Sequence, residues 1–201
     1  MPAGPADVQA AALAGAPAAA AQYRIAHYPA TLIEHWTLAD GREVTVRPVL
    51  PQDAPLTQAF VRALSPASRH RRFHMGLGQL PEQVLRHFTE LDYDRHLALI
   101  AEEFDEDGTE TLVAEARFVR QDDAPVADFA VAVADDWQGR GLGRRLIAKL
   151  ARTAQRRGIR SLQGEVLADN ARMLALLRDM RFELAAAPGD ARLVVARLAL
   201  G

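Results

Sequence analysis

The sequence predicts an α+β protein with a mixed, mostly antiparallel central sheet flanked by helices. Three strand-like segments, His96–Glu102, Thr111–Arg120 and Val126–Ala134, follow one another and are joined by acidic turns. A glycine-rich turn and an amphipathic helix come directly after the third strand. A further strand, a helix and a closing hairpin complete the chain. Strands, then helix, strand, helix and strands in this order are typical of the α+β class.

Composition excludes several classes of function. The chain has 201 residues, a hydrophobic fraction of 49% and a formal net charge of −2, so we expect an enzyme-sized core and no basic stripe for nucleic acid. It contains no cysteine, which excludes disulfides and thiolate metal sites. No apolar run approaches the roughly 20 residues that a membrane helix needs. We therefore expect a cytoplasmic protein that binds neither nucleic acid nor membrane.

The first 22 residues consist mainly of alanine, proline and glycine and carry almost no charge. They lack the basic start of a signal peptide, and Asp7 and Gln9 lie where its apolar region would fall. We predict a disordered tail over residues 1–22, followed by one domain over residues 23–201.

The first half of the domain begins with a strand at Arg42–Arg47, where polar and apolar residues alternate before Pro48. Asp53 is the expected cap of a helix that runs through Leu64. Ser65 and Pro66 begin the next helix, because proline is favoured at the first helical position. A third helix is predicted from Pro81 to about Leu91.

The second half begins with the helix behind the glycine-rich turn. Gly158 is expected to end this helix, and Asn170 to cap a later one that reaches Met180. Ser161–Val166 is the strand between them. The hairpin strands are predicted at Phe182–Ala186 and Arg192–Ala199, and the first helix is expected to bury Leu142, Leu146, Ile147, Leu150 and Ala154.

The glycine-rich turn is the most informative segment for function. Gln138-Gly139-Arg140-Gly141-Leu142-Gly143 joins a strand to a helix whose unpaired N–H groups and positive dipole end favour a phosphate. Arg140, Arg144 and Arg145 add positive charge. The turn is not a P-loop, because the sequence contains no Gly-Lys pair. It is not a dinucleotide-binding G-x-G-x-x-G motif either, because the position of the third glycine is occupied by Arg144 when counted from Gly139 and by Leu146 when counted from Gly141. The turn predicts a pyrophosphate site of another kind.

The remaining pattern, [QR]-x-x-G-x-[GA], is met by Gln138, Gly141 and Gly143. In this context the chain resembles the GNAT family of acyl-CoA-dependent N-acetyltransferases, whose fold has the same order of elements. More specific blocks resemble the GNAT domain of bacterial Pat-type protein lysine acetyltransferases. They are Leu64–Arg69, Arg72-Phe73, Phe88–Arg95, Ala98–Ala101 and Asn170–Met173 followed by Phe182.

The resemblance implies that acetyl-CoA is the acyl donor and that no metal takes part. The backbone of Val131–Val133 would pair with the pantetheine arm, and the Val133 N–H would face the thioester oxygen. Asn170 is expected to contact the cofactor, although a helix cap also explains it. The residues expected to bind the cofactor are Val131, Ala132, Val133, Gln138, Gly139, Arg140, Gly141, Leu142, Gly143, Arg144 and Asn170.

An alkyl amine has a pKa near 10 and must lose a proton before it attacks a thioester. Asp128 is our first candidate for the proton acceptor, directly or through water, since related families usually carry glutamate there. Glu115 on the preceding strand is the second candidate. The position where many GNATs offer a tyrosine to the leaving thiolate is Leu177, which leaves Tyr93 or solvent as the donor.

Two histidines and a basic cluster have more ordinary interpretations. His70 and His74 have a metal-binding spacing, but no third ligand lies near them in the sequence, so we predict no metal site. The run Arg69–Arg72 is either an exposed helix side or a contact for the 3′-phosphate of coenzyme A or for an acidic acceptor.

The sequence thus predicts an acetyl-CoA-dependent N-acetyltransferase that acts on protein lysine ε-amines, with acyl-CoA synthetases among the possible acceptors. Without cysteine, transfer is expected by direct attack in a ternary complex. Two alternatives stay open: acetylation of a small amine, and a non-catalytic acyl-CoA-binding regulatory module. The acyl-chain preference and the oligomeric state are not predicted.

Overall fold

The computed structural model describes residues 28–74, 78–122 and 124–201. The tail predicted over residues 1–22 lies outside these ranges. The described strands form one eight-stranded sheet in the order β1-β2-β3-β4-β5-β6-β8-β7. Its strands are β1 Glu34–Thr37, β2 Glu43–Pro48, β3 His96–Phe104, β4 Glu110–Arg120, β5 Val126–Val133, β6 Ser161–Leu167, β7 Glu183–Ala187 and β8 Asp190–Ala199.

The pairing confirms a mixed, mostly antiparallel sheet. β5 and β6 are parallel, whereas the other neighbouring pairs are antiparallel. The parallel pair arises because the chain crosses over through a helix between these two strands. The α-helices are α2 Ala54–Ala63, α3 Pro66–Phe73, α4 Glu82–Thr89, α5 Leu142–Arg156 and α6 Ala171–Asp179, and the 3-10 turns are η2 Ala30–Leu32, η3 Pro51–Asp53 and η4 Asp135–Trp137.

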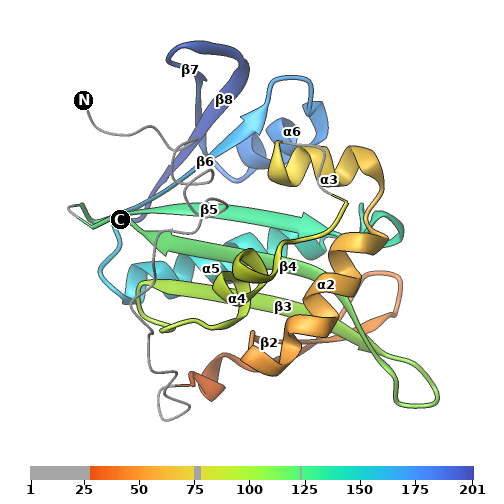
Figure 1. Ribbon diagram of the computed structural model, residues 1–201. Coiled ribbons are helices and arrows are strands. Elements are labelled where there is room, and N and C mark those ends of the chain that lie inside the picture. Colours follow the sequence, from red (N-terminus) through yellow and green to blue (C-terminus); the bar gives the residue numbers. More distant parts are fainter. Residues whose placement is uncertain (1–27, 75–77, 123) are drawn as a thin grey trace.

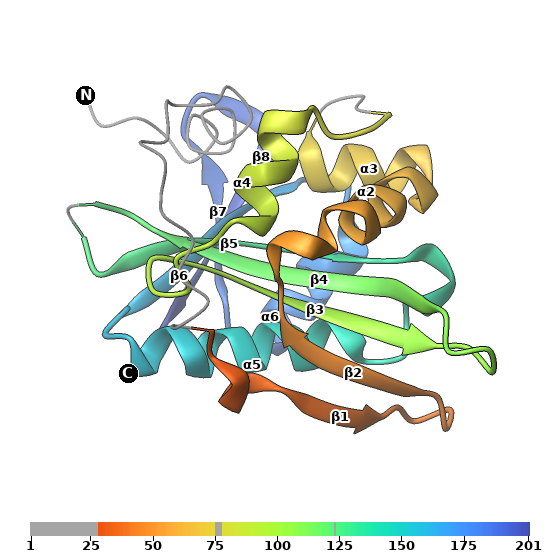
Figure 2. The same ribbon diagram turned by 60° about the horizontal axis from the view of Figure 1, so that its bottom comes forward.

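Helices cover both faces of the sheet. Helices α2, α3 and α4 lie on one face and α5 on the other, as the two views in Figures 1 and 2 show. Helix α5 buries the five apolar side chains expected to point inward. One basic residue of α5 departs from the predicted pattern: Lys149 is buried and pairs with Glu34 on β1. A long lysine stem packs well against apolar neighbours when its ammonium has a partner.

Most element boundaries agree with the sequence within a few residues. The sequence analysis missed β1, because Glu34–Thr37 has a single buried residue, Trp36, and therefore shows no clear alternation. The capping role expected of Asp53 is wrong: its carboxylate accepts no hydrogen bond from the start of α2. Instead Asp53 accepts from the Arg47 guanidinium at 2.6 and 3.0 Å. The predicted cap at Asn170 is confirmed, and Ser65 also caps its helix by accepting from the Ser68 N–H.

The parallel pairing between β5 and β6 is short. It joins Val126–Asp128 to Ser161–Gln163, and the two strands separate beyond these residues. Gly164 stands just after the last pair, where a Cβ would lie 2.8 Å from the Phe129 carbonyl oxygen and 2.9 Å from its ring. The missing side chain lets the Phe129 ring pack against β6 at the point of separation.

We predict that Gly164→Ala lowers the free energy of unfolding by about 1–3 kcal/mol, since the added methyl must displace the backbone of β5. Urea denaturation measures this difference. Gly78→Ala is the matched control, because a Cβ there meets open space, and it should leave stability nearly unchanged. Equal stability of both variants with the native chain would contradict the packing argument.

Candidate functional site

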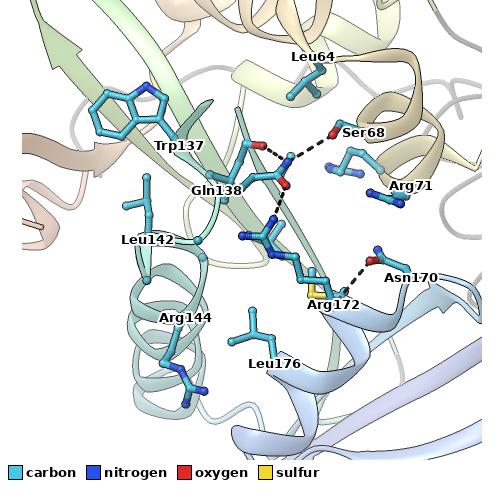
Figure 3. Close-up of a pocket in the computed structure, with 18 residues that line it drawn as sticks. Leu64, Ser68, Arg71, Trp137, Gln138, Leu142, Arg144, Asn170, Arg172 and Leu176 are labelled. Atoms are coloured by element: carbon cyan, nitrogen blue, oxygen red, sulfur yellow. Dashed lines mark hydrogen bonds between the residues drawn. The ribbon is translucent and has the colours of Figure 1, made fainter. Parts of the chain in front are cut away.

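A cavity of about 330 Å³ lies where β5 leaves β6 (Figure 3). Its walls come from α3, the end of β5, the turn before α5, the first residues of α5, and α6. The lining residues are Leu64, Ser68, Arg71, Arg72, Val131, Ala132, Val133, Trp137, Gln138, Gly139, Gly141, Leu142, Gly143, Arg144, Asn170, Arg172, Met173 and Leu176.

The Gln138 side chain ties three walls of this cavity together. Its amide nitrogen donates to the Val133 carbonyl at 3.1 Å and to the Ser68 hydroxyl at 3.3 Å. Its amide oxygen accepts from Arg172 at 3.2 Å, so α3, β5 and α6 meet at one side chain (Figure 3). Asp135 strengthens the α3 contact by accepting from the hydroxyls of Ser65 and Ser68.

The turn before α5 depends on two glycines with left-handed backbone. Gly139 has φ of 84° and Gly141 has φ of 83°, and other residues rarely adopt these values. Gly141 is the N-cap of α5 and gives no side-chain cap, and the first turn of the helix carries no acidic residue. The first N–H groups of α5 therefore face the cavity without a competing carboxylate, as an anion site requires.

The charge around the cavity is positive. Arg71, Arg72, Arg144 and Arg172 line it, and no carboxylate does so within the described part of the chain. Arg140 and Arg145, which the sequence placed at the same phosphate, are engaged elsewhere. Arg140 binds Asp40 and the Asp136 carbonyl, whereas Arg145 donates to the Thr37 carbonyl and lies over the Trp36 ring. Arg145 follows Arg144 on α5 and so points about 100° away from it, whereas Arg140 lies in the turn before the helix and is held by Asp40 and Asp136.

The backbone of β5 offers unpaired groups on the side of β6. Ala134, directly after β5, donates its N–H to the Val113 carbonyl of β4, and neighbouring residues of a strand point their backbone groups in opposite directions. The N–H groups of Val133 and Val131 therefore face the gap between β5 and β6. The pairing of β4 with β5 has no bulge that would reverse this direction. An extended ligand arm fits this edge as an additional strand.

Asp128 lies three residues before Val131 and is absent from the cavity walls. Its carboxylate accepts from Gln121 at 3.1 Å and from Gln163 at 3.0 Å. Burial raises the pKa of Asp128 above its ordinary value, although the two amide donors oppose the shift. Asp128 is paired with Val119 of β4, and Glu115 lies four residues before Val119 on the same strand. Because side chains alternate between the two faces of a sheet, both carboxylates lie on the same face, under α3 and α4.

Glu115 is buried in an ionic cluster between the sheet and the helices. Arg117 donates to its carboxylate, and Arg72 of α3 lies 3.7 Å away. Burial raises the pKa of Glu115, but the two guanidinium groups outweigh it and hold the pKa below its usual value. Arg117 also donates to the Phe88 carbonyl of α4 at 3.3 Å, so this carboxylate anchors two helices to the sheet.

Leu177 and Tyr93, the two positions considered for protonation of the leaving thiolate, both lie outside the cavity walls. Leu177 is fully buried in the core. Tyr93 is also buried, does not line the cavity, and donates its hydroxyl to the Val49 carbonyl at 2.9 Å. Asn170 caps α6 by accepting from the Met173 N–H at 3.3 Å, which confirms the helix-cap interpretation, and it also lines the cavity.

Ten of the eleven residues expected to bind a cofactor line the cavity, and Arg140 does not. Sequence reasoning left the role of Arg69–Arg72 open and did not include Ser68, Arg172, Met173 or Leu176, which also line the cavity. Arg71 and Arg72 belong to the basic cluster already noted, and Arg172 follows Asn170 within a recognised block. Hydrophobic contacts such as Leu64 and Leu176 carry no signal in the sequence, because such residues are equally typical of a core.

A model of the acetyltransferase (GNAT) family matches residues 65–182. The chain belongs to this family. Acetyltransferase PA5475 of Pseudomonas aeruginosa is 33% identical over 169 residues, which are 83% of this chain and 90% of that protein. Acetyltransferase Pat of Mycolicibacterium smegmatis is 32% identical over 138 residues, which are 68% of this chain but only 40% of that protein.

The fold agrees with this assignment. The crystal structure of the GNAT domain of S. lividans PAT superposes with a TM-score of 0.77 at 28% identity, covering 86% of this chain and 99% of that domain. The protein is therefore a GNAT acetyltransferase that uses acetyl-CoA. Its cavity combines arginine side chains with a helix N-terminus that carries no acidic residue, and it includes the end of β5; such features would suit the pyrophosphate and the extended pantetheine arm of that donor.

Within residues 28–74, 78–122 and 124–201, no three His, Asp or Glu side chains gather as a metal site would require. No helix in the same ranges is long and apolar enough to cross a membrane.

We predict that Gly143→Asp lowers acetyl-CoA affinity at least about tenfold, or about 1.4 kcal/mol, because it brings a negative charge to the phosphate side of α5. Calorimetric titration measures the dissociation constant. Gly143→Ala is the control for the added side chain, since its Cβ makes an ordinary 3.5 Å contact with Val133. A folded Gly143→Asp variant with native affinity would refute the pyrophosphate assignment.

Proposed function

We propose that the protein acetylates lysine ε-amines on the surface of other proteins. The likeness to Pat GNAT domains in sequence and fold is the observation that carries this proposal. The chain spans less than half of the Mycolicibacterium relative, so the activity of that whole protein is not transferred. Acyl-CoA synthetases are acceptors to test first, in a cytoplasmic setting and without a role for nucleic acid or membrane.

In the proposed reaction acetyl-CoA supplies an acetyl thioester, and the protein positions it. The N–H groups of Leu142, Gly143 and Arg144 at the start of α5 hold the pyrophosphate. The exposed backbone edge of Val131–Val133 holds the pantetheine arm and presents an N–H of Val133 to the thioester oxygen, where negative charge develops. The absence of cysteine supports direct attack by the amine in a ternary complex.

Asp128 is our proposed proton acceptor, acting through water. Asp128 is not among the residues that line the cavity, which favours a bridging water over direct contact. Its raised pKa makes it a stronger base than an ordinary carboxylate once it is ionised. We assign Glu115 to structure, because its carboxylate is committed to Arg117 and Arg72. Solvent protonates the leaving thiolate, whose thiol has a pKa near 8.5.

We predict that Asp128→Asn lowers kcat roughly 100-fold at neutral pH while acetyl-CoA affinity stays native. The native rate falls as pH drops through the raised pKa of Asp128, because protonation removes the base. The loss in the variant shrinks as pH rises towards the amine pKa, where free amine forms unaided. The rates of both proteins, measured as a function of pH, test both the fall of the native rate at low pH and the smaller difference at high pH.

The variant Glu115→Gln tests the second candidate for the proton acceptor. It leaves two buried guanidinium groups without their carboxylate, so we expect about 3–5 kcal/mol of lost stability in urea denaturation. A folded Glu115→Gln variant that loses only kcat, beside an Asp128→Asn variant with native kcat, would transfer the proton acceptor to Glu115.

The acceptor class is tested by incubating the protein and acetyl-CoA with acyl-CoA synthetases and, separately, with polyamines, amino acids and aminoglycosides. We expect acetylation of particular protein lysines well above the non-enzymatic background, measured by mass spectrometry of tryptic peptides. Rapid turnover of one small amine without protein modification would replace the lysine proposal with the small-amine alternative. Binding of acetyl-CoA without turnover of any acceptor would favour a regulatory module.

A further inference from the structure

A second, smaller hollow adjoins the cavity at the place where β5 and β6 begin to separate. Its volume is about 40 Å³, and it shares Arg71, Arg72, Val131 and Met173 with the larger cavity. Its other wall residues are Phe129, Ala130, Gly164, Glu165 and Val166. The hollow therefore lies beside the edge of β5 to which we assign the pantetheine arm.

The two walls of this hollow carry opposite charge. Helix α3 contributes Arg71 and Arg72, and Figure 3 shows Arg71 across the larger cavity from Leu142. Strand β6 contributes Glu165, the one carboxylate that lines either hollow within the described residues. The other wall residues are glycine and apolar side chains.

Strand alternation places Glu165 on this wall. Gln163 reaches Asp128 with a 3.0 Å hydrogen bond across the last paired position of β5 and β6. Glu165 follows two residues later and belongs to the same face of the sheet. The backbone pairing between β5 and β6 ends at Gln163, while on its other side β6 pairs Glu165 with Val195 of β8. Its half-buried side chain thus stands at the opening of the gap.

We propose that Glu165 binds the ammonium group of a primary alkyl amine and thereby selects the acceptor. This inference rests on the proposed function, since a lysine side chain is one such amine. A carboxylate in a partly buried wall attracts a cation more strongly than it does in bulk water. The guanidinium groups on α3 repel the same cation, so the amine is held against the sheet, near Val131.

The size and polarity of the hollow define the class of acceptor. Phe129, Val131, Val166 and Met173 surround the space with apolar atoms, which suit the methylene chain of an unbranched amine. An alcohol of the same length gains nothing from the charge of Glu165. Binding by Glu165 and proton removal through Asp128 are then separate tasks on neighbouring strands.

The test compares Glu165→Gln with the native chain, using n-butylamine and a lysine peptide with a blocked α-amine as acceptors. We expect KM for both amines to rise at least about tenfold while kcat at saturation stays within about twofold. Acetyl-CoA affinity, measured by calorimetry, stays native. Glu183→Gln on the exposed strand β7 is the matched control and should keep native kinetics.

A second measurement does not require turnover. In the presence of coenzyme A, n-butylammonium chloride is titrated into each protein, and NMR chemical-shift changes give its dissociation constant, with n-butanol as the neutral comparison. We expect saturable binding of the ammonium to the native and Glu183→Gln proteins and at least about tenfold weaker binding to Glu165→Gln.

The outcomes separate this inference from the proposed function. Native KM and native ammonium binding in Glu165→Gln would overturn it, and so would the absence of ammonium binding to the native protein. A loss of kcat at unchanged KM would also overturn it, because Glu165 would then act in proton transfer. If n-butylamine turnover depends on Glu165 but no protein lysine is modified, the inference stands and the protein-acceptor proposal fails.

Discussion

The site depends on a short parallel pairing between two strands. β5 and β6 hold together over Val126–Asp128 and Ser161–Gln163 and then separate. The separation leaves N–H and C=O groups of β5 without a strand partner, and such groups are costly unless water or a ligand satisfies them. The cavity, the free edge for the pantetheine arm and the second hollow all lie in the gap that results.

Positive and negative side chains occupy different parts of this gap. The donor cavity is lined by arginines and ends at an uncapped helix N-terminus, which together match the phosphates of coenzyme A. The carboxylates lie further along the sheet, at Asp128 and Glu165, on the side assigned to the amine. Glu115 lines neither cavity, and its two arginine partners make it an anchor for α3 and α4. One sheet face thus serves both packing and the proposed chemistry.

Local patterns predicted most of the fold. The strands from His96 to Ala134, the glycine turn and helix α5 have periodicities that leave little ambiguity. β1 was missed because its single buried residue produces no alternation. Asp53 was assigned as a cap because it precedes a helix, but Arg47, six residues earlier on β2, binds its carboxylate instead. This largely buried ion pair takes the place of the local capping interaction.

The sequence by itself determined the glycine turn, the helix behind it and the family, because these depend on backbone conformation and spacing within one short segment. It also placed Asp128 and Glu115 on neighbouring strands. Only the tertiary structure decided which arginines face the cavity, since Arg140 and Arg145 turn to partners more than 90 positions away in the chain. It likewise decided that Glu115 is enclosed by guanidinium groups and that Glu165 lines the gap, because burial and charge are set by segments that meet only after folding.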